Sequence, residues 1–309
     1  MRLGVLDIGS NTVHLLIVDA HRGGQPDPQA SVKTELQLAT LLTKDGSLSK
    51  SGERQLEEAV GEARREAEER GVEDLVAFAT SAIREASNGD EVVDRIRTST
   101  GVDLNVLHGE DEARLTFFAV RRWFGWSAGR LLVVDIGGGS LEVADGDHEE
   151  AASAFSFTLG AARMHHELIE GHDPAKAGDV AALREHAREL LRPLKPLRKE
   201  PPDLAVATSK TLRSLARIGG AAPRAQGPRV PRSLTRDSLR KIAEMLMRTT
   251  VEERAALPGV SKARAPQLLA GAVVAEEAMD VLGLGVLAIC PWALREGVIL
   301  RRLDWLAGV

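Results

Sequence analysis

The stretch VLDIGSNTVH at residues 5–14 returns, little changed, as VVDIGGGSLE at residues 133–142, and this repeat decides the fold. In each copy an apolar run with β-branched residues reaches an aspartate, and small residues follow before the chain becomes apolar again. That pattern predicts a strand that enters a tight turn. Glycine lets backbone N–H groups approach a ligand closely, and successive N–H groups in such a turn cradle phosphate oxygens. The repeat therefore predicts two similar domains that face one phosphate-bearing ligand.

The residues in and beside these turns are the first candidate site residues. Asp7 and Asp135 stand at the mouths of the turns, and Glu142 follows the second turn by two residues. Carboxylates beside phosphate oxygens suit Mg²⁺. Glycine-rich turns that bind nothing are common, but the repetition of Asp, Ile and Gly at the same places favours phosphate. The predicted phosphate ligands are Gly9, Ser10, Asn11, Thr12, Gly137, Gly138, Gly139 and Ser140.

The composition is that of an ordinary soluble globular protein, with 43% hydrophobic and 28% charged residues. A chain of 309 residues is long enough for two domains with substantial cores. The formal net charge of −5 argues against a dedicated DNA-binding protein.

The single cysteine, Cys290, excludes an internal disulfide and suits a reducing compartment. It ends the apolar run Val281–Cys290, which is shorter than the roughly 20 residues that a bilayer span needs. A buried small hydrophobe is therefore favoured over a nucleophile at this position. The N-terminus enters a strand-like segment at once, so no signal peptide is expected. These features predict a cytoplasmic protein with no membrane segment.

Strand patterns alternate with helix patterns in both halves, which predicts the α/β class. A hairpin is expected around the first turn, and a capping box at Thr250–Glu253 is expected to open a short helix. The segment Arg184–Arg198 is expected to be mostly helix, broken at its two prolines. The other main expected elements are strands at Leu75–Ala79, Val102–Leu107 and Leu204–Ala207, helices at Glu53–Arg70, Glu110–Phe124 and Gln267–Val281, and a seam between domains at Trp126–Gly129.

Three acids open the predicted helix that begins at Glu110. Acids in the first turn of a helix complement its macrodipole, which explains Glu110 and Asp111 without any function. A hydrolase also needs a base that orients and deprotonates water, and a carboxylate near bound phosphate is suited to this role. Glu112 is the candidate for it, although the macrodipole explanation is open for Glu112 too.

Two hydroxyl-rich segments follow predicted strands, where α/β sheets place ligand sites. Thr80–Asn88 contains Arg84 and Asn88, whose side chains can bind phosphate oxygens. Thr208–Thr211 follows the strand Leu204–Ala207 in the same way. Simple helix caps explain both segments equally well.

The window Leu215–Arg236 contains five arginines and no acid. A solvated loop is the plain interpretation. The alternative is an electrostatic track for a polyanion longer than one nucleotide. The arginines are Arg217, Arg224, Arg229, Arg232 and Arg236.

Together these segments resemble the exopolyphosphatase / guanosine pentaphosphate phosphatase (Ppx/GppA) family. The matching pieces run in the family's order over essentially the whole chain, and five in register are highly specific. The short length, without the helical C-terminal extension of longer members, is similar to the compact actinobacterial exopolyphosphatases. The pieces are Asp7–Thr12, Ala79–Arg84, Gly109–Leu115, Asp135–Glu142 and Leu294–Gly297.

The resemblance implies the actin-like fold of sugar kinases and Hsp70-type chaperones, with two ribonuclease-H-like domains around a central cleft. The implied N-terminal domain comprises residues 1–127 and the C-terminal helix 296–309. The implied C-terminal domain comprises residues 128–295. The resemblance also suggests a homodimer.

The resemblance implies roles for the candidate residues as well. Glu112 would activate the attacking water, while Asp135 and Glu142 would hold Mg²⁺, or Mn²⁺, with Asp7 nearby. The turns at Gly9–Thr12 and Gly137–Ser140 would cradle phosphates with help from Arg84 and Asn88. One departure is Ser209-Lys210-Thr211, because many members have Ser-Gly-Thr there. Lysine brings a cation in place of a close backbone approach, which favours a plain polyanion over a guanosine ligand.

The predicted function is therefore Mg²⁺-dependent removal of terminal orthophosphate from inorganic polyphosphate, with short chains preferred. The nearest alternative is 5′-phosphohydrolysis of guanosine pentaphosphate (pppGpp). A non-catalytic sensor of pppGpp or ppGpp in the stringent response is a third interpretation, although a water-activating Glu112 argues against it. A sugar kinase would need an adenosine pocket and a sugar-positioning aspartate, and neither is identified in the sequence.

Overall fold

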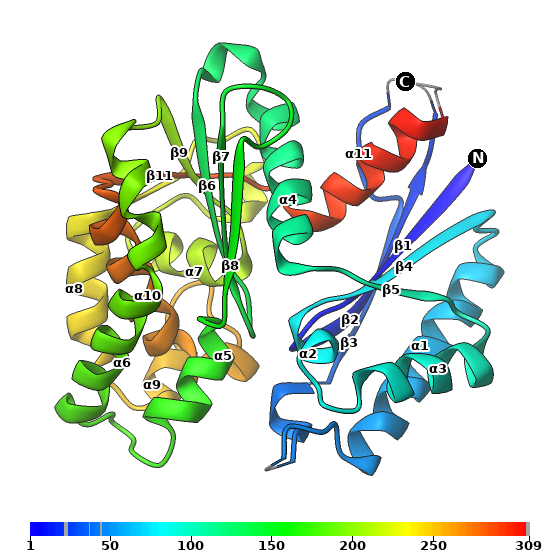
Figure 1. Ribbon diagram of the computed structural model, residues 1–309, viewed down its shortest axis with the longest axis horizontal. Coiled ribbons are helices and arrows are strands. Elements are labelled where there is room, and N and C mark those ends of the chain that lie inside the picture. The colour runs from blue at the N-terminus through cyan, green and yellow to red at the C-terminus, as the bar shows by residue number, and fades with distance from the viewer. Residues whose placement is uncertain (22–23, 37, 44, 307–309) are drawn as a thin grey trace. The chain divides into compact units, whose positions relative to one another are not determined.

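The computed structural model describes residues 1–21, 24–36, 38–43 and 45–306. The chain packs into two compact units, shown in Figure 1. Unit 1 comprises Met1–Leu115 and Leu294–Val309, and unit 2 comprises Thr116–Ala293.

Unit 1 is built on a five-stranded sheet in the order β3-β2-β1-β4-β5. The first three strands form an antiparallel meander, and β4 and β5 run parallel to β1. The predicted hairpin around the first turn is the pair β1–β2. The strands are β1 (Arg2–Ile8), β2 (Thr12–Asp19), β3 (Ala30–Glu35), β4 (Asp74–Ala79) and β5 (Leu104–Val106).

Side chains of β1 are buried on both faces of this sheet. Leu6 and Ile8 pack with helices α1 (Lys50–Glu69) and α3 (Gly89–Thr100). Leu3 and Val5 pack with α11 (Leu294–Leu306) on the other face. Because alternate residues of a strand share a face, Asp7 lies on the α11 side.

Unit 2 is built on a six-stranded sheet in the order β10-β11-β9-β6-β7-β8. Helices α6 (Ala177–Leu190) and α8 (Arg236–Leu246) pack against α10 (Leu268–Leu282), which is buried along almost its whole length. The strands are β6 (Leu131–Ile136), β7 (Leu141–Gly146), β8 (Ser153–Phe157), β9 (Leu204–Ala207), β10 (Ser233–Thr235) and β11 (Val286–Ile289).

The two sheets repeat one topology. In unit 2, β6, β7 and β8 form the antiparallel meander and β9 and β11 continue it in parallel, as β4 and β5 do in unit 1. Strand β10 is an addition at the edge. The predicted α/β class, with two ribonuclease-H-like domains of the actin-like fold, is confirmed.

The boundary between the units differs from the predicted one after residue 127. The chain passes from unit 1 to unit 2 after Leu115, inside the continuous helix α4 (Gly109–Phe124). Leu115 packs with the core that includes α11, whereas Arg121 donates hydrogen bonds to the carbonyls of Gly129 and Gly146 in unit 2. The second boundary, after residue 293 rather than 295, follows from the start of α11 at Leu294.

Most expected elements are present, with shifted ends. The capping box of Thr250 and Glu253 is confirmed at the start of α9 (Val251–Ala255). Helix α6 ends at Leu190, and the proline-containing segment Arg192–Lys199 continues as a 3-10 helix. Strand β3 and helices α3 and α8 were not predicted.

Cys290 is fully buried, as its apolar setting predicted. No helix among the residues that the structure describes is long and apolar enough to cross a bilayer.

His165 is expected to give unit 2 a specific response to acid. It opens a π-helical turn (His165–Ile169), its Nδ1 is buried without a hydrogen-bond partner, and burial lowers its pKa from the ordinary 6.5. The unfolded chain therefore binds a proton near pH 6.5 that the folded chain does not bind, so stability falls as the pH drops through that value. We expect the melting temperature of His165→Gln to fall less than that of the wild type when the pH is lowered from about 7.5 to about 5.5. An equal loss would contradict this, and the exposed His148→Gln serves as the control.

Candidate active site

The turn of unit 1 connects β1 to β2. The amide of Gly9 donates to the carbonyl of Thr12 at 3.0 Å, which closes the turn. The buried hydroxyls of Ser10 and Ser81 lie 3.1 Å apart, so the turn is braced by helix α2 (Ser81–Arg84). A Cβ on Gly9 would make only ordinary contacts, the nearest at 3.7 Å from the Thr12 carbonyl oxygen, so no clash within the fold requires glycine at this position.

The turn of unit 2 closes in the same way, with the amide of Gly137 2.9 Å from the carbonyl of Ser140. Its carbonyls are bound by helix α5 (Ala161–Met164). The amides of Ala161 and Ala162 donate to Gly137 and Gly138 at 3.0 and 2.9 Å. The Arg163 amide also donates to the Gly138 carbonyl, and its guanidinium Nε donates to the Gly139 carbonyl at 3.1 Å.

This capping of the carbonyls orients the turn. In a trans peptide the C=O and the following N–H point in opposite directions. The amides of Gly138, Gly139 and Ser140 therefore point away from α5. Successive N–H groups that share a direction suit the binding of an anion.

Asp135 and Glu142 form a pair of carboxylates beside the unit 2 turn. They are directly opposite partners in the antiparallel register of β6 and β7. Thr208 donates its hydroxyl hydrogen to Asp135 Oδ2, and Ser156 donates to Glu142 Oε1 at 3.0 Å. Like charges in direct cross-strand positions repel, and Glu142 is 5% exposed.

A divalent cation with oxygen ligands relieves such repulsion, so this pair fits Mg²⁺. No group of three or more His, Cys, Asp or Glu side chains that could hold a metal occurs in the described part of the chain. Phosphate oxygens and water would have to supply the remaining ligands, as is usual for Mg²⁺.

Asp7 has different partners. Its register partner is His14, at the position that Glu142 occupies in the second copy. Arg295, in the first turn of α11, lies 3.4 Å from Asp7 Oδ2 and donates to His14 Nδ1. His14 Nε2 then carries the hydrogen and donates to the Ser31 hydroxyl at 2.7 Å. Asp7 thus has a cation from the protein itself, which does not favour the metal-ligand role predicted for it.

Glu112 differs from the two acids before it in the helix because its side chain is buried. Glu110 and Asp111 are exposed, as their plain macrodipole role predicts, whereas Glu112 is 7% exposed. Arg84 Nη1 pairs with Glu112 Oε1 and also donates to the Leu107 carbonyl at 2.8 Å. The structure therefore brings together the candidate base and one candidate phosphate ligand.

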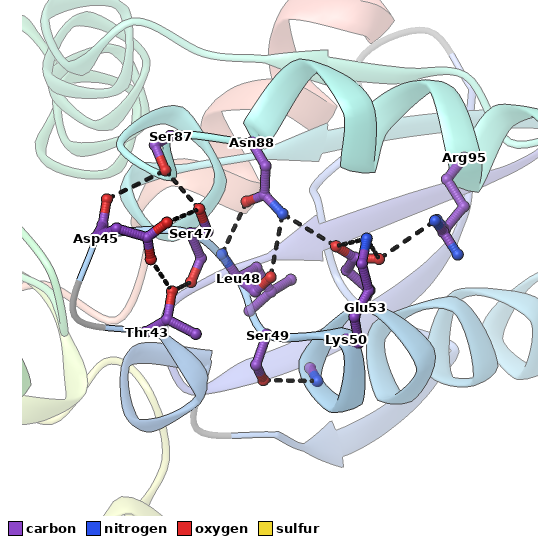
Figure 2. Close-up of polar contacts among 11 residues, drawn as sticks. Thr43, Asp45, Ser47, Leu48, Ser49, Lys50, Glu53, Ser87, Asn88 and Arg95 are labelled. Carbon is purple, nitrogen blue, oxygen red and sulfur yellow. Dashed lines mark hydrogen bonds and ion pairs between the residues drawn. The ribbon is translucent and has the colours of Figure 1, made fainter.

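Asn88 lies elsewhere in unit 1, as Figure 2 shows. Its Oδ1 accepts from the Leu48 amide at 2.8 Å, and its Nδ2 donates to the Leu48 carbonyl at 3.1 Å and to Glu53 Oε1 at 3.0 Å. Both hydrogens of the amide are engaged, so the structure gives no support to the phosphate-binding role predicted for Asn88.

For several residues of these sites, the sequence did not predict the contacts that the structure shows. Thr208 was part of a candidate segment, but its bond to Asp135 could not be read from the sequence. Arg295 belonged to a matching motif without a role. Ser156 and Arg163 had no signal at all, because Ser156 bonds to Glu142 on the neighbouring strand and Arg163, in helix α5, bonds to a backbone carbonyl of the turn.

The Ppx/GppA phosphatase family matches residues 17–305 of this sequence. The chain belongs to this family. Exopolyphosphatase 1 of Mycobacterium tuberculosis is 54% identical over 306 residues, which cover 98% of this chain and 89% of that protein. The guanosine-5′-triphosphate,3′-diphosphate pyrophosphatase of Aliivibrio fischeri is 27% identical over 303 residues, covering 97% of this chain and 59% of that protein.

The chain is also similar to solved structures of an exopolyphosphatase and of a Ppx/GppA enzyme. The crystal structure of an exopolyphosphatase from Cytophaga hutchinsonii superposes with a TM-score of 0.88 at 26% identity, covering 99% of this chain and 98% of that one. The Aquifex aeolicus Ppx/GppA enzyme gives a TM-score of 0.79 at 26% identity, covering 97% of this chain and 99% of that one.

In this Ppx/GppA chain the segment Thr208–Thr211 begins helix α7 (Lys210–Ile218). Ser209 has a φ of 59°, a region that favours glycine, and its hydroxyl caps the Leu212 amide at 3.3 Å. Backbone strain of this kind clusters at functional sites. Lys210 is exposed at the first position of the helix, so the departure from Ser-Gly-Thr places a cation on the surface.

In the arginine-rich window of this Ppx/GppA protein, two of the arginines bind backbone carbonyls of the window itself. Arg232 donates to four backbone carbonyls of the window, and Arg217 donates to a fifth. Arg236 pairs with Asp280 at 3.1 Å. Arg229 is exposed and stacks on Trp123, with its guanidinium carbon 4.2 Å from the ring centroid. The window therefore has mainly a structural role, and the track interpretation rests on Arg224 and Arg229.

Proposed function

We propose that the protein is an exopolyphosphatase that removes terminal orthophosphate from inorganic polyphosphate with the help of Mg²⁺. The observation that carries the proposal is the oriented turn Gly137–Ser140 beside the Asp135–Glu142 pair. Three amides directed one way suit phosphate oxygens, and two opposed carboxylates suit the cation that accompanies them. The 54% identity to a mycobacterial exopolyphosphatase favours this substrate.

In the proposed reaction, Glu112 accepts a proton from water while the water oxygen attacks the terminal phosphorus. The bond from that phosphorus to the bridging oxygen breaks, and the electron pair stays with the shortened chain. The guanidinium of Arg84 holds the Glu112 carboxylate in place. Mg²⁺, when bound at Asp135 and Glu142, supplies positive charge to the phosphate oxygens. Positioning and electrostatic stabilisation provide most of the acceleration in phosphoryl transfer.

The proposal also covers the compartment in which the enzyme works, the metal that it uses and its oligomeric state. We place it in the cytoplasm, since the one cysteine is a buried apolar residue rather than half of a disulfide. Mn²⁺ is expected to replace Mg²⁺, because it takes the same oxygen ligands. The homodimer remains an expectation from the family, as does any part in the stringent response.

The substrate is tested by phosphate release from tripolyphosphate, long-chain polyphosphate and pppGpp at equal concentrations. We expect release from both polyphosphates to exceed release from pppGpp, to stop with EDTA and to return with added Mg²⁺. Faster release from pppGpp would transfer the proposal to guanosine pentaphosphate hydrolysis. Binding of ppGpp without any phosphate release would favour the sensor.

A further inference from the structure

We propose that Asn88 is a positioning residue for the reaction: it fixes helix α2, and thereby the Arg84–Glu112 pair, to the start of helix α1. The inference rests on the proposed function, in which Glu112 is the base. It replaces the phosphate-binding role that the sequence predicted for Asn88.

Helix α2 is held in place by its surroundings: Ser81, Ala82 and Ile83 are buried, and the Ser81 hydroxyl lies 3.1 Å from that of Ser10. It has four residues, Ser81–Arg84, and its N-cap residue Thr80 makes no side-chain capping bond. Isolated helices shorter than about 12 residues are marginal in water. Arg84 is the last residue of this single turn, and its guanidinium is bound by the Leu107 carbonyl and Glu112. The residues that follow α2 help to set the backbone position from which the Arg84 side chain reaches these two partners.

A short connection leads from α2 to Asn88. The Asn88 amide binds both backbone groups of Leu48, which is 2% exposed, and the carboxylate of Glu53, which is 3% exposed (Figure 2). Three hydrogen bonds from one side chain thus join the connection after α2 to the residues around the start of α1.

Glu53 is itself held from two further sides. Lys50 Nζ lies 2.9 Å and Arg95 Nη2 lies 3.4 Å from its carboxylate oxygens. A buried carboxylate costs several kcal/mol of desolvation unless it is paired and hydrogen-bonded. Removing the Asn88 amide therefore takes away one of the contacts on which the burial of Glu53 depends.

Close packing transmits the position of Asn88 to α2. A Cβ on the next residue, Gly89, would lie 2.5 Å from the carbonyl oxygen of Ile83. The start of α3 therefore rests directly on α2, one residue before Arg84. Ser87 adds a second connection, because its hydroxyl lies 2.7 Å from that of Ser47.

The two roles for Asn88 make different kinetic predictions. A phosphate ligand contributes to substrate binding, so its loss raises KM. A residue that positions the base affects kcat and leaves KM for polyphosphate nearly unchanged. A misplacement of about 1 Å in a catalytic group can cost about 10²-fold in rate.

The experiment compares the wild type, Asn88→Ala and the control Asn105→Ala, an exposed asparagine of β5 in the same unit. We expect Asn88→Ala to lower kcat by about 10- to 100-fold, to leave KM within about twofold, and to speed amide hydrogen exchange across residues 80–88. Asn105→Ala should match the wild type in all three. An unchanged kcat, or a raised KM with normal kcat and normal exchange, would overturn the proposal.

A donor–acceptor exchange tests the same contact without deleting it. Asn88→Asp alone places two carboxylates together and should resemble Asn88→Ala or be worse. The double variant Asn88→Asp with Glu53→Gln restores a hydrogen bond in the reverse direction and should recover part of kcat. No recovery in a folded double variant would contradict the role of this contact. A wild type that releases no phosphate would remove the proposed function, whereas hydrogen exchange would still report whether Asn88 fixes α2.

Discussion

Glu112→Gln is expected to lower the rate of phosphate release by about 10²- to 10⁴-fold, the usual contribution of a general base. The amide keeps the size of the side chain and can still accept a hydrogen bond from Arg84, but it cannot take a proton from water. KM for polyphosphate should change little, because Glu112 does not bind phosphate. Initial rates of phosphate release and equilibrium binding of polyphosphate measure the two effects separately.

The matched control is Glu110→Gln, two residues earlier in the same helical turn. It removes the same charge from an exposed position, so only a small loss of macrodipole stabilisation is expected. Equal losses of activity in the two variants would mean that the charge of the helix terminus matters and that no single base has been identified. A nearly unchanged rate in Glu112→Gln would remove the base assignment.

Gly160→Ala is expected to abolish most activity through the turn of unit 2, although residue 160 is not part of the turn. A Cβ there would lie 2.2 Å from the carbonyl carbon of Gly139 and 2.3 Å from the carbonyl oxygen of Gly138. Backbone has to move to relieve such contacts, and the amides that the turn presents to phosphate move with it. We expect a loss of about 10²-fold in kcat/KM and a lower melting temperature, since overpacking costs about 1–3 kcal/mol.

Gly178→Ala is the control for this substitution. Gly178 lies in helix α6 of the same unit, and a Cβ there would meet nothing within 4 Å. Alanine in a helix is favoured over glycine by up to about 1 kcal/mol, so this variant should be active and at least as stable. If Gly160→Ala retained full activity, the backbone of the turn would not need its observed position.

The turns could be predicted from sequence because their chemistry is local. An apolar strand, an aspartate and small residues specify the turn within ten positions, and the repeat supplied a second, independent copy. The family resemblance singled out Glu112, but the residue pattern alone did not explain why Glu112 rather than Glu110 should be the base. That distinction comes from burial and from Arg84, 28 positions earlier, and depends on how β4, α2 and α4 pack.

The sequence could not separate the roles of Arg84 and Asn88, because both residues belong to one hydroxyl-rich segment. One partner of Asn88 is the backbone of Leu48, which leaves no residue-type signal, and the other is Glu53, 35 positions earlier in the chain. Likewise, the contact of Arg295 with Asp7 joins residues near opposite ends of the chain. The boundary inside α4 was missed because a helix that is continuous in sequence pattern gives no sign that its two halves serve different cores.

The register of the two hairpins has a consequence for stoichiometry. Where unit 2 opposes aspartate with glutamate, unit 1 opposes aspartate with a histidine and adds an arginine. The two turns are closed by the same backbone hydrogen bond, while the side chains beside them differ in charge. We therefore expect each chain to bind one divalent cation rather than two. In unit 1 the positive charge beside the aspartate is supplied by an arginine of the protein itself.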